Sequence, residues 1–248
     1  MKRFKRVLLA LLLLPALALA KVPDDEDILD RTMNTSSPFY YTKLMMRYNA
    51  GDSTMTDEDY HYLYYGYAFQ DAYKPFASNQ ALDRMLMIAA RIDVERPLRE
   101  DLELLVSAGN DAQKVDPFSP KVLNLMAYAY GALGDTIRER AYYERMNRII
   151  RTIEQSGDGY TQKTPQHILM FDHALDVLAS EGLPYGRSRV ISREVEFVPL
   201  VSPMVIEGKK RKGFYFDFSR IYRNKPEGYT YKRDRTWQFN NLKPRTYK

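Results

Sequence analysis

The side chains in this sequence that could carry out acid–base or metal chemistry are few. Its 248 residues contain no cysteine and only three histidines, His61, His167 and His173, so neither a thiol nucleophile nor a thiolate metal ligand is present. Asp172 precedes His173, but adjacent residues on a helix point apart and do not form an acid–base pair. We therefore interpret the histidines as ordinary surface residues, and we expect neither a metal ion nor a cofactor.

Motifs for phosphate binding or for a catalytic serine are also missing from the sequence. No glycine-rich phosphate loop occurs, and the run Gly186-Arg187-Ser188-Arg189 lacks the second glycine of a serine nucleophile elbow. One catalytic possibility stays open, because a fold can bring together carboxylates from distant segments. We keep an envelope hydrolase of that kind as the alternative to a non-catalytic function.

Residues 60–69 read YHYLYYGYAF and are unusually rich in aromatic rings. Residues three and four apart share a face of a helix, which places Tyr62, Tyr65 and Phe69 on one stripe together with Gly66. We expect this stripe to pack against a partner helix. A glycine inside a helix costs ~1 kcal/mol relative to alanine, so close approach of a neighbouring backbone is the expected compensation.

The opposite stripe of this helix is the candidate ligand-binding surface. Together with residues at equivalent offsets in a later helix, it would line a groove of tyrosines and polar side chains, the mixed chemistry that peptide or glycan binding needs. The predicted site consists of Tyr60, Tyr67, Gln70, Asp71, Lys121, Asn124 and Tyr128. The alternative interpretation is that a basic C-terminal sheet covers this side of the helices.

The first twenty residues predict the compartment. A basic head, KRFKR, precedes an apolar run from Val7 to Leu19, and Ala18 and Ala20 supply the small residues of a cleavage site. We predict that residues 1–20 are a secretory signal peptide, cleaved after Ala20, and that the protein is periplasmic or secreted. The rival is a retained anchor, but about thirteen apolar residues are fewer than the ~20 that a membrane span needs. We expect no membrane span in the mature chain.

Charge divides the mature chain into two parts. Residues 21–185 hold 17 Lys and Arg against 26 Asp and Glu, whereas residues 186–248 hold 16 against 6. We predict a helical repeat-like domain over the first range and a basic sheet region over the second, drawn together by opposite charge. An external anionic partner for the basic region is the alternative. Nucleic acid is not an expected partner, because an exported protein seldom meets it.

The spacing of apolar residues and the capping residues predict about seven helices before Gly182. Their expected ranges are 37–49, 56–71, 79–91, 97–114, 120–133, 136–155 and 164–182. After Pro184, period-two alternation predicts a small antiparallel sheet of three or four strands that includes 194–198, 214–218 and 229–239. A sheet this small must lay its apolar face on the helices, so the predicted fold class is α+β.

One helix pair resembles a tetratricopeptide repeat. The residues that match the repeat in type and offset are Leu123, Met126, Ala127, Tyr130, Gly134, Asp135 and Tyr143. Two positions depart from the pattern, because Glu139 replaces a small residue and Arg151 replaces the closing proline. The first offsets recur in residues 62–69, which is 61 residues earlier instead of the usual ~34. The resemblance therefore implies an irregular helical array.

The mature chain as a whole resembles an uncharacterised family of exported Bacteroidetes proteins, domain of unknown function 4919. The likeness rests on Pro38-Phe39-Tyr40-Tyr41, on Tyr64-Tyr65-Gly66-Tyr67 and on the Tyr- and Phe-rich basic tail. It implies a location in the cell envelope and supplies neither an activity nor site residues. We expect a non-catalytic envelope binding or scaffold protein with a groove for a peptide segment or a glycan, and envelope proteins, peptides or glycans as its partners.

Overall fold

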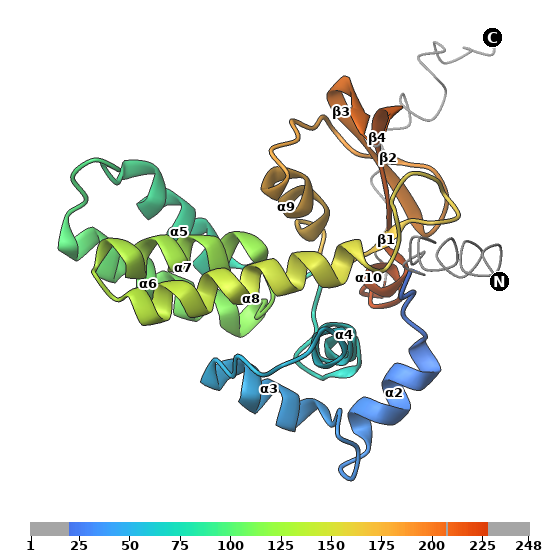
Figure 1. Ribbon diagram of the computed structural model, residues 1–248, viewed down its shortest axis with the longest axis horizontal. Helices are drawn as coiled ribbons and strands as arrows, with labels where there is room; N and C mark the ends of the chain where they lie inside the picture. Colours follow the sequence, from blue (N-terminus) through green and yellow to red (C-terminus); the bar gives the residue numbers. More distant parts are fainter. Residues whose placement is uncertain (1–19, 207, 228–248) are drawn as a thin grey trace, which may run out of the picture.

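The computed structural model describes residues 20–206 and 208–227, in which helices precede a small sheet (Figure 1). The helices are α2 (Asp25–Met33), α3 (Tyr41–Ala50), α4 (Asp57–Gly66), the 3₁₀ turn η1 (Tyr67–Phe69), α5 (Gln80–Arg91), α6 (Arg99–Val115), α7 (Pro120–Ala132), α8 (Thr136–Glu154), α9 (His173–Ser180) and α10 (Ser219–Arg223). The strands are β1 (Gln166–His167), β2 (Arg189–Val190), β3 (Val195–Ile206) and β4 (Lys209–Asp217). The predicted α+β class is confirmed.

Several helices begin where their capping residues predict. Thr56 and Asp59 form a reciprocal capping box at the start of α4. Ser119 accepts a hydrogen bond from a backbone N–H of α7, whose first residue is Pro120. Asp135 caps α8 after Gly134, which adopts a φ of +84° and so allows the tight turn between the two helices. Local capping chemistry therefore sets the ends of the helices that carry the site.

Helix α4 lies at the centre of the molecule. In Figure 1 it is seen end-on, with α2, α3 and the second half of α8 around it. Helices α5, α6 and α7 pack successively beside the first half of α8 at one end of the molecule. The long helix α8 thus joins this end to the region that holds the sheet.

Two apolar clusters stabilise this arrangement. The smaller cluster lies among α5, α6 and α7, and the larger one surrounds α4. The larger cluster joins Tyr65 of α4 and Phe118, which precedes α7, to Val198 of β3 and Phe216 of β4, all fully buried. Burial of apolar surface is the main favourable term in folding, and here it holds the sheet on the helices.

The sheet has the order β1-β4-β3-β2 and is mixed. Strands β3 and β4 are antiparallel, with Phe197 opposite Tyr215, as the alternation predicted. The prediction of a purely antiparallel sheet was wrong, because β1 pairs with β4 in parallel. The strand expected at 229–239 lies outside the described residues, as do residues 1–19 of the predicted signal peptide.

The helix expected at 164–182 was also too long. Gln166 and His167 pair with β4 instead of opening a helix, and the N–H of Ile168 donates to the carbonyl of Asp217 at 3.3 Å. Helix α9 begins only at His173. A short buried apolar run fits a strand or a helix equally well, and pairing with β4 decides the outcome. Within residues 20–206 and 208–227, no helix is long and apolar enough to cross a membrane.

Candidate functional site

The tyrosines of the predicted groove lie in the core. Tyr60 is 5% exposed and Tyr67 is 3% exposed, and the hydroxyl of Tyr67 donates to the carbonyl of Val115 at 3.0 Å. Gln70 is half-buried and Asp71 is exposed. The tyrosines are buried because α4 is enclosed on all its faces, by α2, α3, α8 and the sheet, so neither of its two aromatic stripes lines an open groove.

The remaining predicted site residues belong to α7. Lys121 pairs with the buried carboxylate of Asp176 at 3.2 Å, and Asn124 is exposed. The hydroxyl of Tyr128 is buried and has no hydrogen-bond partner among the described residues. The structure therefore places the seven predicted residues in three different settings, the core, an ion pair and the solvent, and does not gather them on one open surface.

The interpretation of the histidines as surface residues was wrong for two of the three. His61 is 5% exposed and His173 is 1% exposed. The two nitrogens of His173 bridge the Tyr64 hydroxyl at 2.7 Å and the Asp116 carboxylate at 2.9 Å. Burial alone would lower the pKa of His173, but the charge and hydrogen bond of Asp116 outweigh it, so the pKa is raised. His173 thus links the Asp116 carboxylate to the Tyr64 hydroxyl inside the core.

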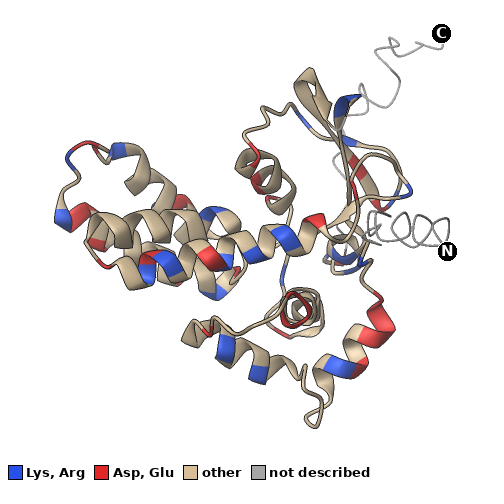
Figure 2. Ribbon diagram, viewed as in Figure 1, with Lys and Arg blue, Asp and Glu red and all other residues tan. Residues whose placement is uncertain are grey.

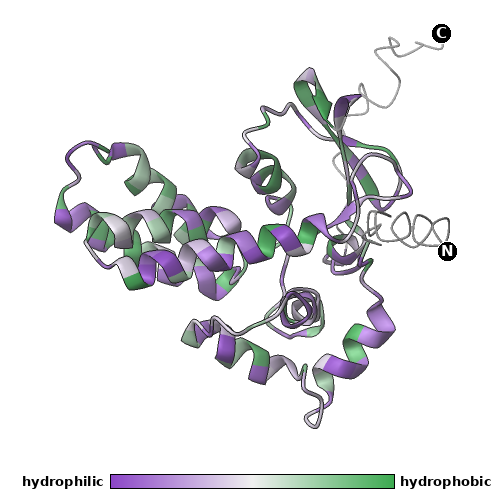
Figure 3. Ribbon diagram, viewed as in Figure 1, coloured by the Kyte–Doolittle hydropathy of each residue, from purple (hydrophilic) through white to green (hydrophobic). Residues whose placement is uncertain are grey.

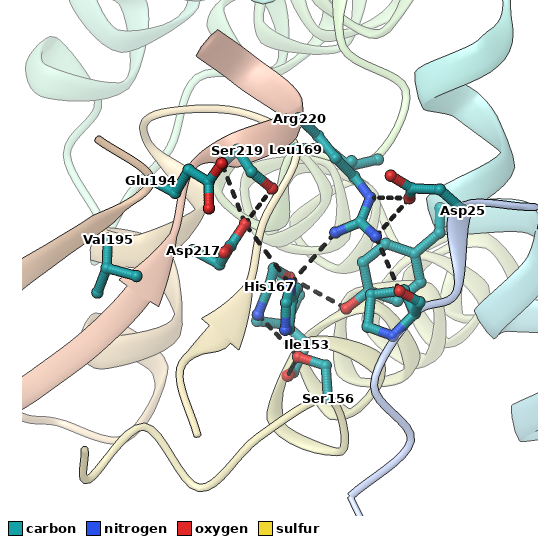
Figure 4. A network of polar contacts seen from close by, with 12 residues as sticks. Asp25, Ile153, Ser156, His167, Leu169, Glu194, Val195, Asp217, Ser219 and Arg220 are labelled. Atoms are coloured by element: carbon teal, nitrogen blue, oxygen red, sulfur yellow. Dashed lines mark hydrogen bonds and ion pairs between the residues drawn. The ribbon is translucent and has the colours of Figure 1, made fainter. Parts of the chain in front are cut away.

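A second polar network joins α2, β1, β4 and α10 (Figure 4). Arg220, which is 3% exposed, donates to the carboxylate of Asp25, to the carbonyl of Pro23 and to Nδ1 of His167. The backbone N–H of His167 in turn donates to Ser156 Oγ at 2.8 Å. Each nitrogen of the Arg220 guanidinium has a partner, so this network is closed and stabilises the fold without offering free groups to a ligand.

An open hollow of about 530 Å³ lies between the end of α8, α9 and the β3–β4 hairpin. Its volume falls in the range of small-molecule sites. Four residues form its apolar wall: Val177, Leu178, Leu183 and Ile206. Its polar groups come from segments far apart in sequence, namely the ends of α8 and α9, strand β1 and strand β4. The tertiary fold therefore brings these groups together, and this hollow is the candidate site.

Two carboxyl groups meet in this hollow. Glu154 is the last residue of α8, and Glu181 follows the end of α9. The pKa of Glu154 is raised to about 7: burial is the largest cause, the charge and hydrogen bond of Glu181 act in the same direction, and the charge of Arg151 opposes them. Like charges in contact do not both ionise readily, so Glu154 keeps its proton up to about pH 7.

Beside the carboxyl pair, the hollow holds a buried acceptor without a donor. Gln166 is 6% exposed, and its Oε1 has no hydrogen-bond partner among the described residues. Arg211 Nε is likewise buried without a partner there, although the guanidinium stacks on the ring of Tyr160 at 3.4 Å from its centroid. A buried polar atom without a partner costs about 1–3 kcal/mol, and a ligand that supplies the partner recovers that free energy.

A second hollow of about 380 Å³ lies where the loop before α5 meets Asp116 and Phe171. Its main ionisable group is already engaged, because Asp116 accepts hydrogen bonds from His173 and from the backbone N–H of Phe118. In the described part of the chain, no group of three or more His, Asp or Glu side chains is placed to hold a metal ion. The first hollow is therefore the better candidate.

Sequence reasoning did not identify Glu154, Glu181 or Gln166. The two glutamates are 27 positions apart and each ends a different helix, so no local spacing connects them. Gln166 was assigned to a helix, which removed it from the sheet that positions it. The one sequence signal nearby is the loop Ser156-Gly157-Asp158-Gly159, which reverses the chain after α8.

Comparison with known proteins gives the family and no function. No curated protein matches the chain, and no solved structure matches it. A family model described as a domain of unknown function, DUF4919, matches residues 26–227, which include every element described above except the first residue of α2. The chain belongs to the DUF4919 family.

Proposed function

We propose that this protein is an exported, non-catalytic binding protein of the cell envelope, and that the hollow between α8, α9 and the hairpin is its ligand site. The observation that carries the proposal is Gln166, which lines the hollow and whose buried Oε1 has no donor among the described residues. Native proteins rarely leave such a group unpaired, and the exceptions call for a functional reason. Here the reason is a ligand that supplies the donor.

The lining of the hollow indicates the ligand class. Glu154, Glu181 and Gln166 present acceptor oxygens, and Arg211 presents a donor. The apolar wall of α9 and Ile206 contacts the carbon atoms of whatever binds. A glycan or a peptide segment has this combination of N–H or O–H donors, acceptors and apolar stems. The export part of the proposal rests on the leader-like residues 1–20.

Replacement of Gln166 by leucine tests the proposal with two readouts. The mature chain, residues 21–248, is applied to arrays of glycans and of short peptides, and its affinity for each bound probe is measured. Gln166→Leu removes the acceptor and keeps the volume, so we expect binding to weaken about tenfold, as one lost hydrogen bond predicts. The same change removes an unpaired buried polar group, so the unliganded protein becomes more stable.

The matched control is Gln80→Leu, which alters an exposed glutamine on α5, far from the hollow in sequence. It leaves both affinity and stability unchanged. Unchanged affinity in Gln166→Leu, or no binding of the wild type to either array, contradicts the proposal. A destabilised Gln166→Leu variant means that the amide is already bonded within the protein, which also contradicts it.

The carboxyl pair favours hydrolysis as a second candidate function. Hydrolysis of this kind requires two carboxyl groups in one cleft, and Glu154 and Glu181 meet that requirement. Two carboxyl groups that share a proton form the dyad of aspartic proteases. Glycoside hydrolases instead separate theirs by about 5 Å or more, so the hydrogen bond between Glu154 and Glu181 fits glycoside hydrolysis poorly.

A turnover assay separates the two functions. The mature chain is incubated with the peptides or glycans that it binds, and products are followed by mass spectrometry. Hydrolysis predicts cleavage that Glu154→Gln abolishes while binding persists. Binding alone predicts intact probes after incubation with either form of the protein, and cleavage by the wild type contradicts the non-catalytic proposal.

A further inference from the structure

The outer half of the β3–β4 hairpin projects from the body of the protein. Every residue from 201 to 205 is exposed, including Val201 at 68% and Val205 at 73%. Residues 204–206 lie beyond the irregularity in strand pairing between Pro199 and Met204, and Val201, within the irregularity, donates its backbone N–H to the carbonyl of Pro184. Figure 1 shows the end of the hairpin reaching past the helices. Figure 3 shows hydrophobic residues along this part of β3. Val201, Val205 and Met204, which is 39% exposed, form the apolar patch of the hairpin, in which the adjacent Met204 and Val205 point to opposite faces of the strand.

Lysines accompany this apolar patch on the neighbouring strand. Val205 lies opposite Lys210 and Ile206 opposite Lys209, and Lys212 follows on β4. All three lysines are exposed, and none of them forms an ion pair within residues 20–206 and 208–227. Figure 2 shows this positive charge on β4. The described residues of the tip therefore combine exposed apolar side chains with three lysines that form no ion pair among themselves or with other described residues.

This distribution differs from the rest of the basic region. Arg220 and Arg223 both form ion pairs with Asp25, so these two arginines contact the acidic part of the chain. Lys209 lines the hollow together with Glu154 and Glu181, whereas Lys210 and Lys212 do not line it and form no ion pair with the described residues. The charge of Lys210 and Lys212 is therefore available to an anionic partner.

The shape of the tip decides between partner classes. A stable protein interface needs about 800 Å² of surface on each side, whereas the end of the hairpin consists of only two strands. A lipid bilayer needs no matching surface, because apolar side chains enter the interface and lysines contact headgroup phosphates. Valine, methionine and lysine side by side suit that boundary.

We propose that the β3–β4 hairpin docks on an anionic lipid surface, with Val201, Met204 and Val205 entering the interface and Lys209, Lys210 and Lys212 contacting lipid phosphates. This goes beyond the ligand-binding proposal and does not depend on it. Ile206 and Lys209 also line the hollow, so docking holds the mouth of the hollow next to the membrane surface. Ligands attached to that membrane then reach the hollow directly.

Sedimentation with vesicles tests the docking. The mature chain is mixed with vesicles of phosphatidylcholine alone or of phosphatidylcholine with phosphatidylglycerol, and the bound fraction is measured. We expect binding to the anionic vesicles only. Lys210→Glu with Lys212→Glu, which do not line the hollow, should weaken it about tenfold or more, and Val201→Ser with Val205→Ser should weaken it at unchanged charge.

The matched control is Lys43→Glu with Lys74→Glu, two exposed lysines outside the hairpin, and it should bind as the wild type does. All of these changes are at exposed positions, so melting temperatures should stay unchanged and folding is not in question. Equal binding to neutral vesicles, or full binding by the lysine variant, overturns the proposal. Heparin capture at wild-type strength by the valine variant, together with its unweakened vesicle binding, would identify a general polyanion site and also overturn it.

Discussion

Arg220 on α10 donates to the same carboxylate oxygen of Asp25 from Nε at 2.9 Å and from Nη2 at 2.6 Å. Asp25 begins α2, so this contact joins the first helix of the described chain to the last. Arg223 reaches the other oxygen of the same carboxylate at 2.6 Å. The predicted attraction between an acidic and a basic part of the chain thus takes the form of one shared carboxylate.

Replacing Arg220 by methionine should destabilise the protein strongly. The side chain is almost fully buried, and its loss leaves Asp25, the Pro23 carbonyl and His167 without their donor. Breaking a buried ion pair costs about 3–5 kcal/mol, and the partial exposure of Asp25 reduces this to about 2–4 kcal/mol. Urea unfolding measures the change.

Arg223 supplies the control on the same carboxylate. Its side chain is 54% exposed, so Arg223→Met should cost less than about 1 kcal/mol. Equal losses for the two variants would contradict the assignment of the buried arginine as the main link.

Gly66→Ala should destabilise the protein although alanine favours helices. A Cβ atom at this position would lie 2.7 Å from Cγ2 of Thr32, which is too close, and overpacking of this kind costs about 1–3 kcal/mol. Thr32→Ser removes that methyl group and keeps the hydroxyl that bonds to the Ile28 carbonyl at 2.6 Å. Gly66→Ala should therefore cost about 1 kcal/mol less in the Thr32→Ser background. If the stability losses of the two single variants add up in the double variant, the clash of the new Cβ atom is not with the Thr32 methyl group.

Stability should fall with rising pH through the titration of Glu154. The pKa of this group is about 7 in the folded protein and near its ordinary 4.5 in the unfolded chain, so the unfolded chain ionises first. The free energy of unfolding therefore decreases from about pH 4.5 to about pH 7. Glu154→Gln should remove this decrease and stabilise the protein at pH 8 by about 1–2 kcal/mol, allowing for its partial exposure.

Thermal melts of both forms between pH 4 and pH 8 check the sign. Glu144→Gln, at an exposed position on the same helix, should leave the pH profile of the wild type in place. A wild-type profile that Glu154→Gln does not change would contradict the raised pKa of Glu154.

Tyr67→Ala should unfold the protein more readily, because this ring is core. Tyr67 packs against Tyr73 and Phe118 with ring centroids 5.4 and 5.5 Å away, and truncating a buried aromatic costs about 3–5 kcal/mol. Tyr143→Ala, at a position that is 54% exposed, should change stability by no more than about 0.5 kcal/mol. Chemical denaturation measures the stability of the two variants. A Tyr67→Ala protein as stable as the wild type would contradict the assignment of this ring to the core.

The ends of several helices could be predicted from the local sequence. The capping box at Thr56 and the Ser119-Pro120 start depend on neighbours three residues away, which the sequence displays directly. The compensation for Gly66 was also anticipated, although the group that approaches it is the side chain of Thr32 and not a backbone.

The rest depends on contacts that no local pattern encodes. The stripes on α4 indicated one buried and one open face, yet the helix is enclosed all round because four separate segments surround it. Gln166 became a strand residue through pairing with Phe216, fifty positions away. The hollow forms where that strand pairing meets the ends of α8 and α9. Its lining residues therefore could not be predicted from the sequence without the topology.

The distance along the chain between Asp25 and Arg220 has a consequence for biogenesis. During synthesis the N-terminal helices emerge first, whereas the arginine that fastens them, and the strands that cover α4, are made nearly two hundred residues later. Contacts of such wide separation form slowly and only once the whole chain is present. The N-terminal helices therefore lack this ion pair until Arg220 has been synthesised.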